Sequence, residues 1–398
     1  MKPPSTTTST ASTTNQRPCD VRVVSYNVLS SHLASPSHFS TLNPDHLAAK
    51  NRLPVVSDKI QEEISNRAVI CLQEVSYTWA GSFHTQFANH GYHFVTSLYG
   101  KKFNNYMGVG IAVPTNKYKV VNVDICRLSD KKMDGWPRVP KDANSGFLHR
   151  ILTTVKITIR RVLELIRVVP DSKQLEWNDP WNIAEYRSNA MVTMTLQDKE
   201  TEKCFVIGNY HMPCCFYAPP VMTLHVDLAA KHVETLATTQ QQQQPNDNEN
   251  DINNDKKNET DRPLPYIVAG DWNIKPDSSQ YRLLTTGQMD VGDPDWPSPK
   301  HGMVWKPSAK PLSSAYQLAQ GTEPDFTNYA RVGEQEPFVD TLDYIFLSQD
   351  DNNDSGDKWT VKGVKSLPHR DEAGGPFPNL DRGEPSDHVL IAADLELN

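Results

Sequence analysis

Short apolar runs alternate with polar turns along most of the chain, a pattern typical of α/β proteins. The clearest example is the stretch 266–276, YIVAGDWNIKP, in which Tyr266 to Ala269 form a predicted buried strand. Gly270 relieves crowding where that strand ends, and Asp271 and Asn273 follow two residues apart. An Asp-x-Asn pair after a strand is often an ordinary turn. It gains weight as a functional signal only if other strands of the chain end in similar groups.

The same pattern predicts most of the remaining elements. Further strands are predicted at 21–28, 68–72, 107–113, 191–196, 204–210, 341–347 and 389–397. Helical spacing predicts helices at 45–65, where Pro54 is expected to cause an interruption, at 79–89 and at 221–236.

A basic insert near 127–187 contains the longest apolar periodicity. Between 147 and 169, apolar residues recur close to helical spacing, with charged residues among the intervening positions. Those charges argue against a membrane span. An amphipathic helix packed on the domain is favoured over a helix facing a membrane surface or RNA, and strand structure remains an alternative because Val, Ile and Thr are common there.

Composition bounds the organisation of the chain. It has 398 residues, of which 37% are hydrophobic, so a sizeable core is expected. A Ser/Thr-rich tail at 1–18 and a Gln/Asn/Asp-rich loop near 238–262 are predicted to be disordered. The rest, 19–398, is predicted to form one domain, with the polar loop as an insertion.

Cysteine usage and the N-terminus bear on compartment. The six cysteines show no C-x-x-C pair, and the neighbours Cys214 and Cys215 would be strained as a disulfide. We therefore expect reduced thiols in a cytoplasmic or nuclear protein, not a secreted one. The first 18 residues lack the apolar segment of a secretory signal, whereas a transit peptide is left open.

Charge is unevenly distributed. The net charge is −8, yet the stretch 117–173 contains 13 Lys and Arg against 6 Asp and Glu. A basic stretch of this kind either contacts phosphates or is a solvated face, and the charge count alone does not separate the two.

Polar groups suited to chemistry recur at the ends of the predicted strands and in the adjoining turns. They are Asn27, Glu74, His211, Asp271 with Asn273, Asp343, and the run Ser386-Asp387-His388. Carboxylate and amide oxygens are the ligands that Mg²⁺ prefers, and Mn²⁺ is the alternative ion. The absence of an H-x-x-x-H motif or cysteine cluster disfavours zinc.

The motifs SYNVLS, CLQEVS, NYHMP, VAGDWNIKPDSSQYRLLTTG, TLDYIF and PSDHVLIAADLEL resemble, in order, those of the endonuclease/exonuclease/phosphatase superfamily. The resemblance covers 21–397 and is greatest to the catabolite-repressor-type deadenylases and their relatives nocturnin and angel. It implies a DNase I-like fold, a four-layered α/β sandwich in which two mixed β-sheets lie face to face between helices. The site would lie in a cleft at one end.

The resemblance also implies roles for individual residues. Glu74 would bind Mg²⁺ with Asn27 beside it, and Asp387 would support the metal site. Asp271 would orient and deprotonate the attacking water with help from Asn273. Three residues would act on the phosphate: His388 would hold a non-bridging oxygen, Asp343 would orient His388, and His211 would contact the scissile group.

Three further residues are expected to bind substrate. Phe338 stands five residues before the aspartate of DYIF, where deadenylase-like relatives stack a base, although a core role is an equal alternative. Phe216 replaces the proline that these relatives carry on the opposing wall, and Asn189 completes the set. The substituted wall and the basic insert weaken the expectation of adenosine preference.

The leading hypothesis is therefore a Mg²⁺-dependent 3′-to-5′ exoribonuclease of the deadenylase-like type, acting on a single-stranded 3′ end. A phosphatase or phosphodiesterase for a small nucleotide or a phosphorylated headgroup is the first alternative, because one fold hosts many substrates. An inactive RNA-binding scaffold is disfavoured because every expected catalytic residue is present. The sequence identifies no protein partner.

Overall fold

Two six-stranded sheets form the centre of the molecule. The structure is a computed structural model that describes residues 18–100, 106–140, 179–242, 262–349 and 357–398. The strand order is β13-β14-β1-β2-β4-β3 in the first sheet and β5-β6-β7-β8-β12-β9 in the second, and β10 and β11 form a separate two-stranded ribbon. The strands are β1 (Cys19–Asn27), β2 (Val69–Gln73), β3 (Tyr92–Tyr99), β4 (Met107–Pro114), β5 (Tyr118–Arg127), β6 (Ala190–Asp198), β7 (Cys204–His211), β8 (Tyr266–Asp271), β9 (Leu312–Ser314), β10 (Asn328–Ala330), β11 (Phe338–Asp340), β12 (Asp343–Ser348), β13 (Trp359–Val364) and β14 (Ile391–Leu397).

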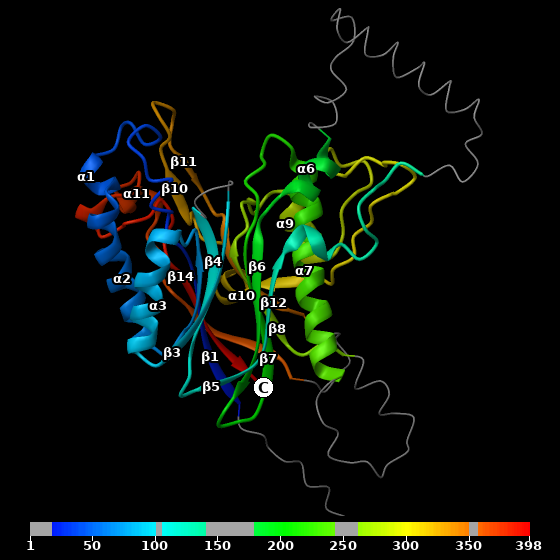
Figure 1. Ribbon diagram of the computed structural model, residues 1–398, viewed down its shortest axis with the longest axis horizontal. Coiled ribbons are helices and arrows are strands. Elements are labelled where there is room, and N and C mark those ends of the chain that lie inside the picture. The colour runs from blue at the N-terminus through cyan, green and yellow to red at the C-terminus, as the bar shows by residue number, and fades with distance from the viewer. Residues whose placement is uncertain (1–17, 101–105, 141–178, 243–261, 350–356) are drawn as a thin grey trace, which may run out of the picture.

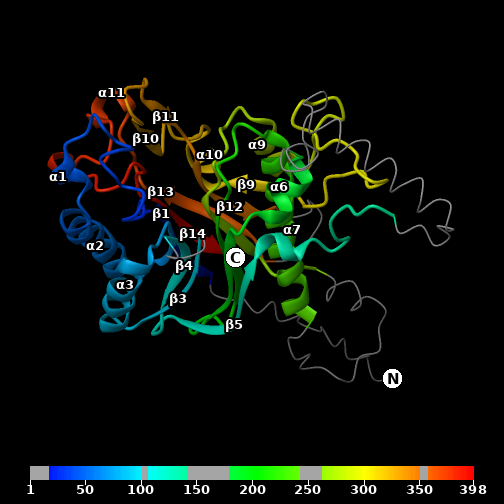
Figure 2. The same ribbon diagram turned by 45° about the horizontal axis from the view of Figure 1, so that its top comes forward.

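Helices cover the outer faces of both sheets, as Figure 1 and Figure 2 show. They are α1 (Pro44–Leu47), α2 (Ala49–Ser65), α3 (Tyr77–Asn89), α6 (Pro180–Tyr186), α7 (Pro219–Gln242), α9 (Ser279–Thr286), α10 (Ala315–Gln320) and α11 (Arg370–Ala373), with 3₁₀ turns η1 (Leu128–Lys131) and η2 (Leu380–Arg382). One hydrophobic core packs α2 and α3 on the first sheet, and another packs α7 and α9 on the second. A third core lies between the sheets, where Val23 and Ile111 of the first join Ile207 and Ile345 of the second. This is the predicted four-layered α/β sandwich.

Strand direction explains why the polar strand ends meet. β1 runs parallel to β2, and β7 runs parallel to β8 with His211 opposite Asp271. β12 runs antiparallel to β8 and begins with Asp343 opposite Asp271, while β14 begins beside the end of β1. Every predicted catalytic group therefore stands at the same end of the two sheets, the end at which β10, β11 and α6 lie in Figure 1.

Several predicted elements differ from the structure in detail. Helix α2 continues through Pro54, and the chain breaks earlier, at Ala48, which has an extended backbone between α1 and α2. Helix α7 continues to Gln242, into the start of the predicted polar loop, which agrees with the good helix propensity of glutamine. Six strands were not predicted: β3, β5, β9, β10, β11 and β13. The possible helix at 147–169 and most of the Ser/Thr-rich tail lie outside the described residues.

Two other predictions concern covalent and membrane features. All six cysteines are free in the structure, Cys214 and Cys215 included. Within the described segments, no helix is both long and apolar enough to cross a membrane.

Candidate active site

A cleft of about 860 Å³ opens at the shared end of the two sheets. Nine of the predicted site residues line it: Glu74, Asn189, His211, Phe216, Asp271, Asn273, Phe338, Asp387 and His388. The other two, Asn27 and Asp343, lie directly behind that lining and hydrogen-bond to it. The fold thus brings all eleven together from both sheets.

Asp271 is at the centre of this cleft and is almost completely buried. Its Oδ2 accepts a hydrogen bond from Asn27 Nδ2 at 2.9 Å and lies 3.5 Å from His211 Nε2 and 3.7 Å from His388 Nε2. Its Oδ1 accepts from the backbone N–H of Asn273 at 3.0 Å. Burial raises the pKa of the Asp271 carboxyl, while the nearby His388 opposes that rise. A carboxylate held between two imidazoles is well placed to accept a proton.

The backbone before Asp271 needs a glycine. Gly270 has φ +148°, and a Cβ at this position would lie 1.8 Å from the carbonyl oxygen of Tyr210 on β7. The close approach of β7 and β8 sets His211 beside Asp271. This is the crowding that the sequence predicted Gly270 to relieve.

His388 is joined to a second buried carboxylate. Its Nδ1 lies 2.7 Å from Asp343 Oδ2, and that oxygen also accepts from the hydroxyl of Thr327 at 2.7 Å. Burial lowers the pKa of His388, but the carboxylates of Asp343 and Asp271 outweigh burial and hold the pKa well above its usual range. The imidazole is therefore positively charged at neutral pH and is suited to binding a phosphate oxygen.

His211 has a different environment. Its Nδ1 lies 3.1 Å from the hydroxyl of Tyr99, a buried residue of β3, and Asn189 Nδ2 donates to the His211 carbonyl at 2.8 Å. Asn273 Nδ2 likewise donates to the next carbonyl, that of Met212, at 2.9 Å. Asn189 and Asn273 thus hold the backbone that carries His211.

Glu74 and Asp387 form the part of the cleft that fits a divalent cation. Glu74 is buried, has φ +58° and accepts from Ser30 N–H through Oε2 at 2.8 Å. Burial raises the pKa of Asp387, and the negative charge of Glu74 raises it further. Two carboxylates that repel each other in this way would gain from a cation between them, and their oxygen donors suit Mg²⁺ or Mn²⁺.

A second grouping has weaker metal character. Oxygens of Asp271 and Asp343 and a ring nitrogen of His388 lie within 4.8 Å of one another. Because the two carboxylates keep His388 protonated, this imidazole is a poor metal ligand. Asn27 was expected beside the metal ion, but both ends of its side chain already have partners. Its Nδ2 donates to Asp271, and its Oδ1 accepts from the N–H of Leu29 at 3.0 Å.

A third grouping lies outside the cleft. Asp124 and Cys126 of β5 meet His232 of α7, again within 4.8 Å. The sequence signalled no such cluster, since His232 is more than 100 residues from Asp124 and Cys126. Lys131 pairs with Asp124 at 3.2 Å, and His232 lies 2.9 Å from the same carboxylate. The negative charge of Asp124 is therefore already compensated without a metal ion.

Aromatic rings form one wall of the cleft. The ring centroids of Phe216 and Phe338 are 6.2 Å apart, and Phe216 is 44% exposed. The ammonium of Lys275 lies 5.1 Å from the centroid of Phe338 and pairs with Asp340 at 2.8 Å. Partly exposed rings beside a cation suit the stacking of a base next to a phosphate.

Sequence reasoning missed four residues that support the cleft: Ser30, Arg52, Tyr99 and Thr327. The guanidinium of Arg52, fully buried, donates to the carbonyls of Val28, Leu29 and Pro385, which flank the loops that carry Ser30 and Asp387. Thr327 lies in a mostly polar run, DFTNY at 325–329, shortly before the TLDYIF motif, so its position offered a signal. Arg52 and Tyr99 offered none, because one is in a helix and the other in a strand that was not predicted.

A family model described as "Endonuclease/Exonuclease/phosphatase family" matches residues 24–388. A curated relative, the CCR4-Not complex 3′-5′-exoribonuclease subunit Ccr4 of Aspergillus fumigatus, is 24% identical over 97% of this chain. That match covers 52% of the relative, so the chain spans about half the length of the protein it resembles.

Two solved structures share the fold. ANGEL2, a 2′,3′-cyclic phosphatase in complex with adenosine-2′,3′-vanadate, aligns with a TM-score of 0.61 and 18% identity over 96% of each chain. The human nocturnin catalytic domain with bound sulfate aligns with a TM-score of 0.55 and 16% identity, over 95% of this chain and 94% of its own. These likenesses agree with the predicted DNase I-like fold.

Proposed function

Because this chain belongs to the endonuclease/exonuclease/phosphatase family, we propose that it is a Mg²⁺-dependent hydrolase that shortens single-stranded RNA from the 3′ end. The observation that carries the proposal is the placement of Asp271 between His211 and His388 in a cleft walled by Phe216 and Phe338. This arrangement sets a proton acceptor, a charged imidazole and an aromatic surface around one space. The likeness to a 3′-5′-exoribonuclease subunit over most of the chain supports RNA as the substrate.

The residues of the cleft have separate roles in hydrolysis. Asp271 accepts a proton from the attacking water, and Asn27 and Asn273 hold its carboxylate in place. His388, charged through Asp343, stabilises a non-bridging phosphate oxygen as negative charge develops there. His211 contacts the scissile phosphate from the neighbouring strand.

Glu74 and Asp387 would hold the metal ion. When bound, Mg²⁺ supplies charge neutralisation at the phosphate. Phe338 and Phe216 stack bases near the 3′ end, which is tolerant of sequence. In the deadenylase-like relatives a proline is expected at the position of Phe216. We therefore propose that this enzyme prefers adenosine only weakly, less than an enzyme with a dedicated poly(A) pocket.

A second candidate is hydrolysis of a small nucleotide phosphate, such as a 2′,3′-cyclic phosphate. It is favoured by the fold shared with ANGEL2 over 96% of both chains. The same catalytic groups serve either reaction, because both break a phosphoester bond.

A time course separates the candidates. RNA labelled at its 5′ end, with an oligoadenylate tail or a matched tail of another base, is incubated with Mg²⁺ or with EDTA. A Mg²⁺-dependent ladder that shrinks from the 3′ end is the expected result, and the two tails measure base preference. Intact RNA of both kinds, together with release of inorganic phosphate from a matched RNA that ends in a 2′,3′-cyclic phosphate, would replace the first proposal by the second.

A further inference from the structure

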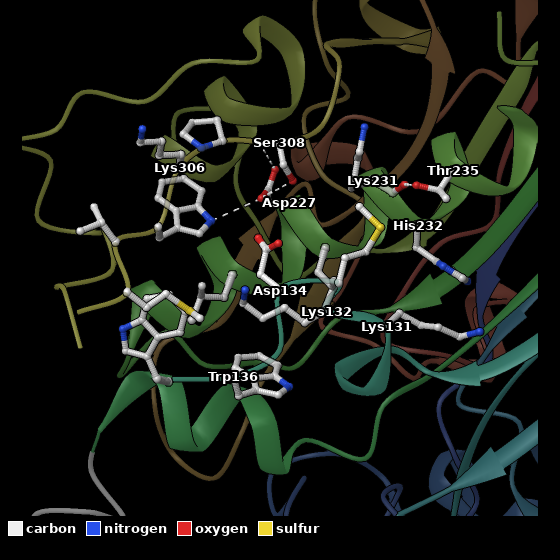
Figure 3. Close-up of a pocket in the computed structure, with 18 of the residues that line it drawn as sticks. Lys131, Lys132, Asp134, Trp136, Asp227, Lys231, His232, Thr235, Lys306 and Ser308 are labelled. Atoms are coloured by element: carbon white, nitrogen blue, oxygen red, sulfur yellow. Dashed lines mark hydrogen bonds between the residues drawn. The ribbon is translucent and has the colours of Figure 1, made fainter. Parts of the chain in front are cut away.

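A second pocket lies on the outer side of the second sheet and shares no lining residue with the catalytic cleft. Its volume is about 530 Å³, and η1, α6, α7 and the 303–308 loop surround it. Figure 3 shows this pocket, with Lys132, Asp134 and Trp136 beneath Asp227 and the 303–308 loop. Neither the proposed reaction nor the predicted site residues account for it.

Three tryptophans give the pocket its aromatic character: Trp136, Trp181 and Trp305. Each indole N–H already donates within the protein, to Ser129 O at 2.8 Å, Ser298 O at 2.7 Å and Asp227 Oδ2 at 3.3 Å respectively. The rings are therefore fixed in orientation and have no N–H left for a ligand. Trp181 and Trp305 are buried and Trp136 is partly exposed, so the ring on which a ligand can stack is that of Trp136.

The charge of the lining is mainly positive. Four lysines (131, 132, 231 and 306) line the pocket, against Asp134 and Asp227. Asp227 is buried, and its carboxylate accepts four hydrogen bonds: from the Trp305 indole, from the N–H and the hydroxyl of Ser308, and from the N–H of Ala309. The carboxylate is therefore already satisfied within the protein.

The lysines are not equivalent. Lys131 pairs with Asp124 and Lys231 with Glu234. Lys132 instead lies over the ring of Trp181, 5.9 Å from its centroid. For Lys132 and Lys306, the described part of the chain offers no ion pair with a carboxylate. These two ammonium groups can meet a phosphate without breaking an existing pair.

Helix α6 connects the pocket to the catalytic cleft. Trp181, near its start, lines the pocket, and Tyr186, its last residue, lines the cleft. The separation along a helix over these residues is about 8 Å. Tyr186 is 67% exposed, and Tyr217, beside Phe216 of the cleft wall, is 74% exposed. Arg187 bonds the Tyr217 hydroxyl at 2.7 Å. Exposed rings and a cation thus lie at the end of α6 that borders the cleft.

We propose that this pocket is a second binding site for single-stranded RNA, which holds a base and a phosphate upstream of the 3′ end that occupies the cleft. The base stacks on Trp136, and the phosphate pairs with Lys132 and Lys306. Fixed aromatic surfaces beside a positive groove are the means by which proteins bind single strands without reading sequence. The inference rests on the proposed function, since it places both sites on one strand.

The test uses the full chain with Asp271→Asn, so that RNA is bound without being cut. Fluorescence anisotropy is measured for a labelled trinucleotide and a labelled pentadecanucleotide over a range of salt. Lys132→Ala with Lys306→Ala is compared with a control of equal charge, Lys119→Ala with Lys199→Ala. Both control lysines are exposed and lie near the opposite end of the second sheet. Trp136→Ala is the third variant, and thermal midpoints check that each is folded.

For the long RNA, removing the contacts to this one phosphate should make the salt slope of log K shallower by about 0.7. Trp136→Ala should weaken binding of the long RNA roughly tenfold. The control pair should leave that slope unchanged, and trinucleotide binding should be the same in all variants. In the active enzyme, kcat/KM for the long RNA should fall with the same variants.

Three other outcomes would overturn the inference, and each can be told apart from the others. If the pocket variants and the control bind long RNA alike while RNA is still cut, the second site is refuted and the proposed function stands. If AMP alone quenches tryptophan fluorescence in a Trp136-dependent way and RNA length has no effect, the pocket binds a mononucleotide instead. If no RNA is bound or cut, the proposed function fails and this inference fails with it.

Discussion

At the scale of single residues, both oxygens of the Asp271 carboxylate have fixed partners, which leaves Oδ2 facing the two imidazoles of the cleft. Asp271→Asn keeps the shape of the side chain and removes its ability to accept a proton. We expect turnover of RNA to fall by at least roughly 10²–10⁴-fold, the usual contribution of a general base. The rate on labelled RNA measures this, and circular dichroism checks the fold. Asp394→Asn, on the exposed face of β14, is the matched control. Activity that survives in Asp271→Asn would refute the role.

Gly270 is a second residue with a sharp expectation. A Cβ added at this position would lie 1.8 Å from the carbonyl oxygen of Tyr210, and the φ of Gly270 is +148°. Gly270→Ala should therefore lower the free energy of unfolding by at least about 3 kcal/mol, through strain at the β7–β8 contact. Gly292→Ala is the control, because nothing lies within 4 Å of its Cβ position and the residue is exposed. Urea unfolding of the two variants measures the difference, and equal midpoints would contradict this account.

At the scale of elements, His225 joins three of them. It lies on α7 and is fully buried, with Nε2 3.0 Å from the Ala184 carbonyl of α6 and Nδ1 2.8 Å from the Tyr210 hydroxyl of β7. Because the carbonyl only accepts, Nε2 carries the hydrogen and Nδ1 accepts from Tyr210. Burial lowers the pKa of His225 to about 4. The neutral ring therefore holds α6, α7 and β7 together.

This pKa predicts a pH dependence of stability. Between the unfolded pKa of about 6.5 and the folded value of about 4, the unfolded chain binds the extra proton. The free energy of unfolding therefore falls as pH drops through this window, by up to about 3 kcal/mol from this group. His225→Gln, which does not titrate, should lose that much less between pH 7 and pH 4 in urea titrations. Parallel pH profiles for the two proteins would contradict the assignment.

The elements also show where the sequence was informative. β2 and β8 are central strands whose apolar runs predicted them, and β1, also central, was predicted from its β-branched residues. β3 and β5 are edge strands with several half-buried or exposed positions, so their apolar signal is interrupted and they were missed. Pro54 predicted a break, yet α2 tolerates it in its second turn.

At the scale of the whole molecule, the cleft depends on contacts between the sheets. Asn27 bonds Asp271, Gln73 Nε2 donates to Asn209 Oδ1 at 2.8 Å, and Tyr99 meets His211, each pair joining one sheet to the other. The strand ends could be predicted as one group because such residues recur at strand after strand and the family resemblance implies a cleft at one end. Their partners across the sheets could not, because those pairs depend on how two sheets separated in sequence pack face to face.

Glu74 and Asp387 give the last prediction. Both come from the first sheet side of the cleft, and the charge of Glu74 raises the pKa of Asp387. A cation bound between them stabilises only the folded chain, by about 2.7 kcal/mol when its concentration is 100 times Kd. Mg²⁺ should therefore raise the thermal midpoint of the wild-type protein and of Asp394→Asn. It should raise that of Glu74→Gln or Asp387→Asn much less, and Mn²⁺ should follow the same order. Scanning fluorimetry with Mg²⁺ and with EDTA measures this independently of any substrate. A full Mg²⁺ shift in Glu74→Gln would place the ion elsewhere, and the grouping of Asp271, Asp343 and His388 would then be the next to test.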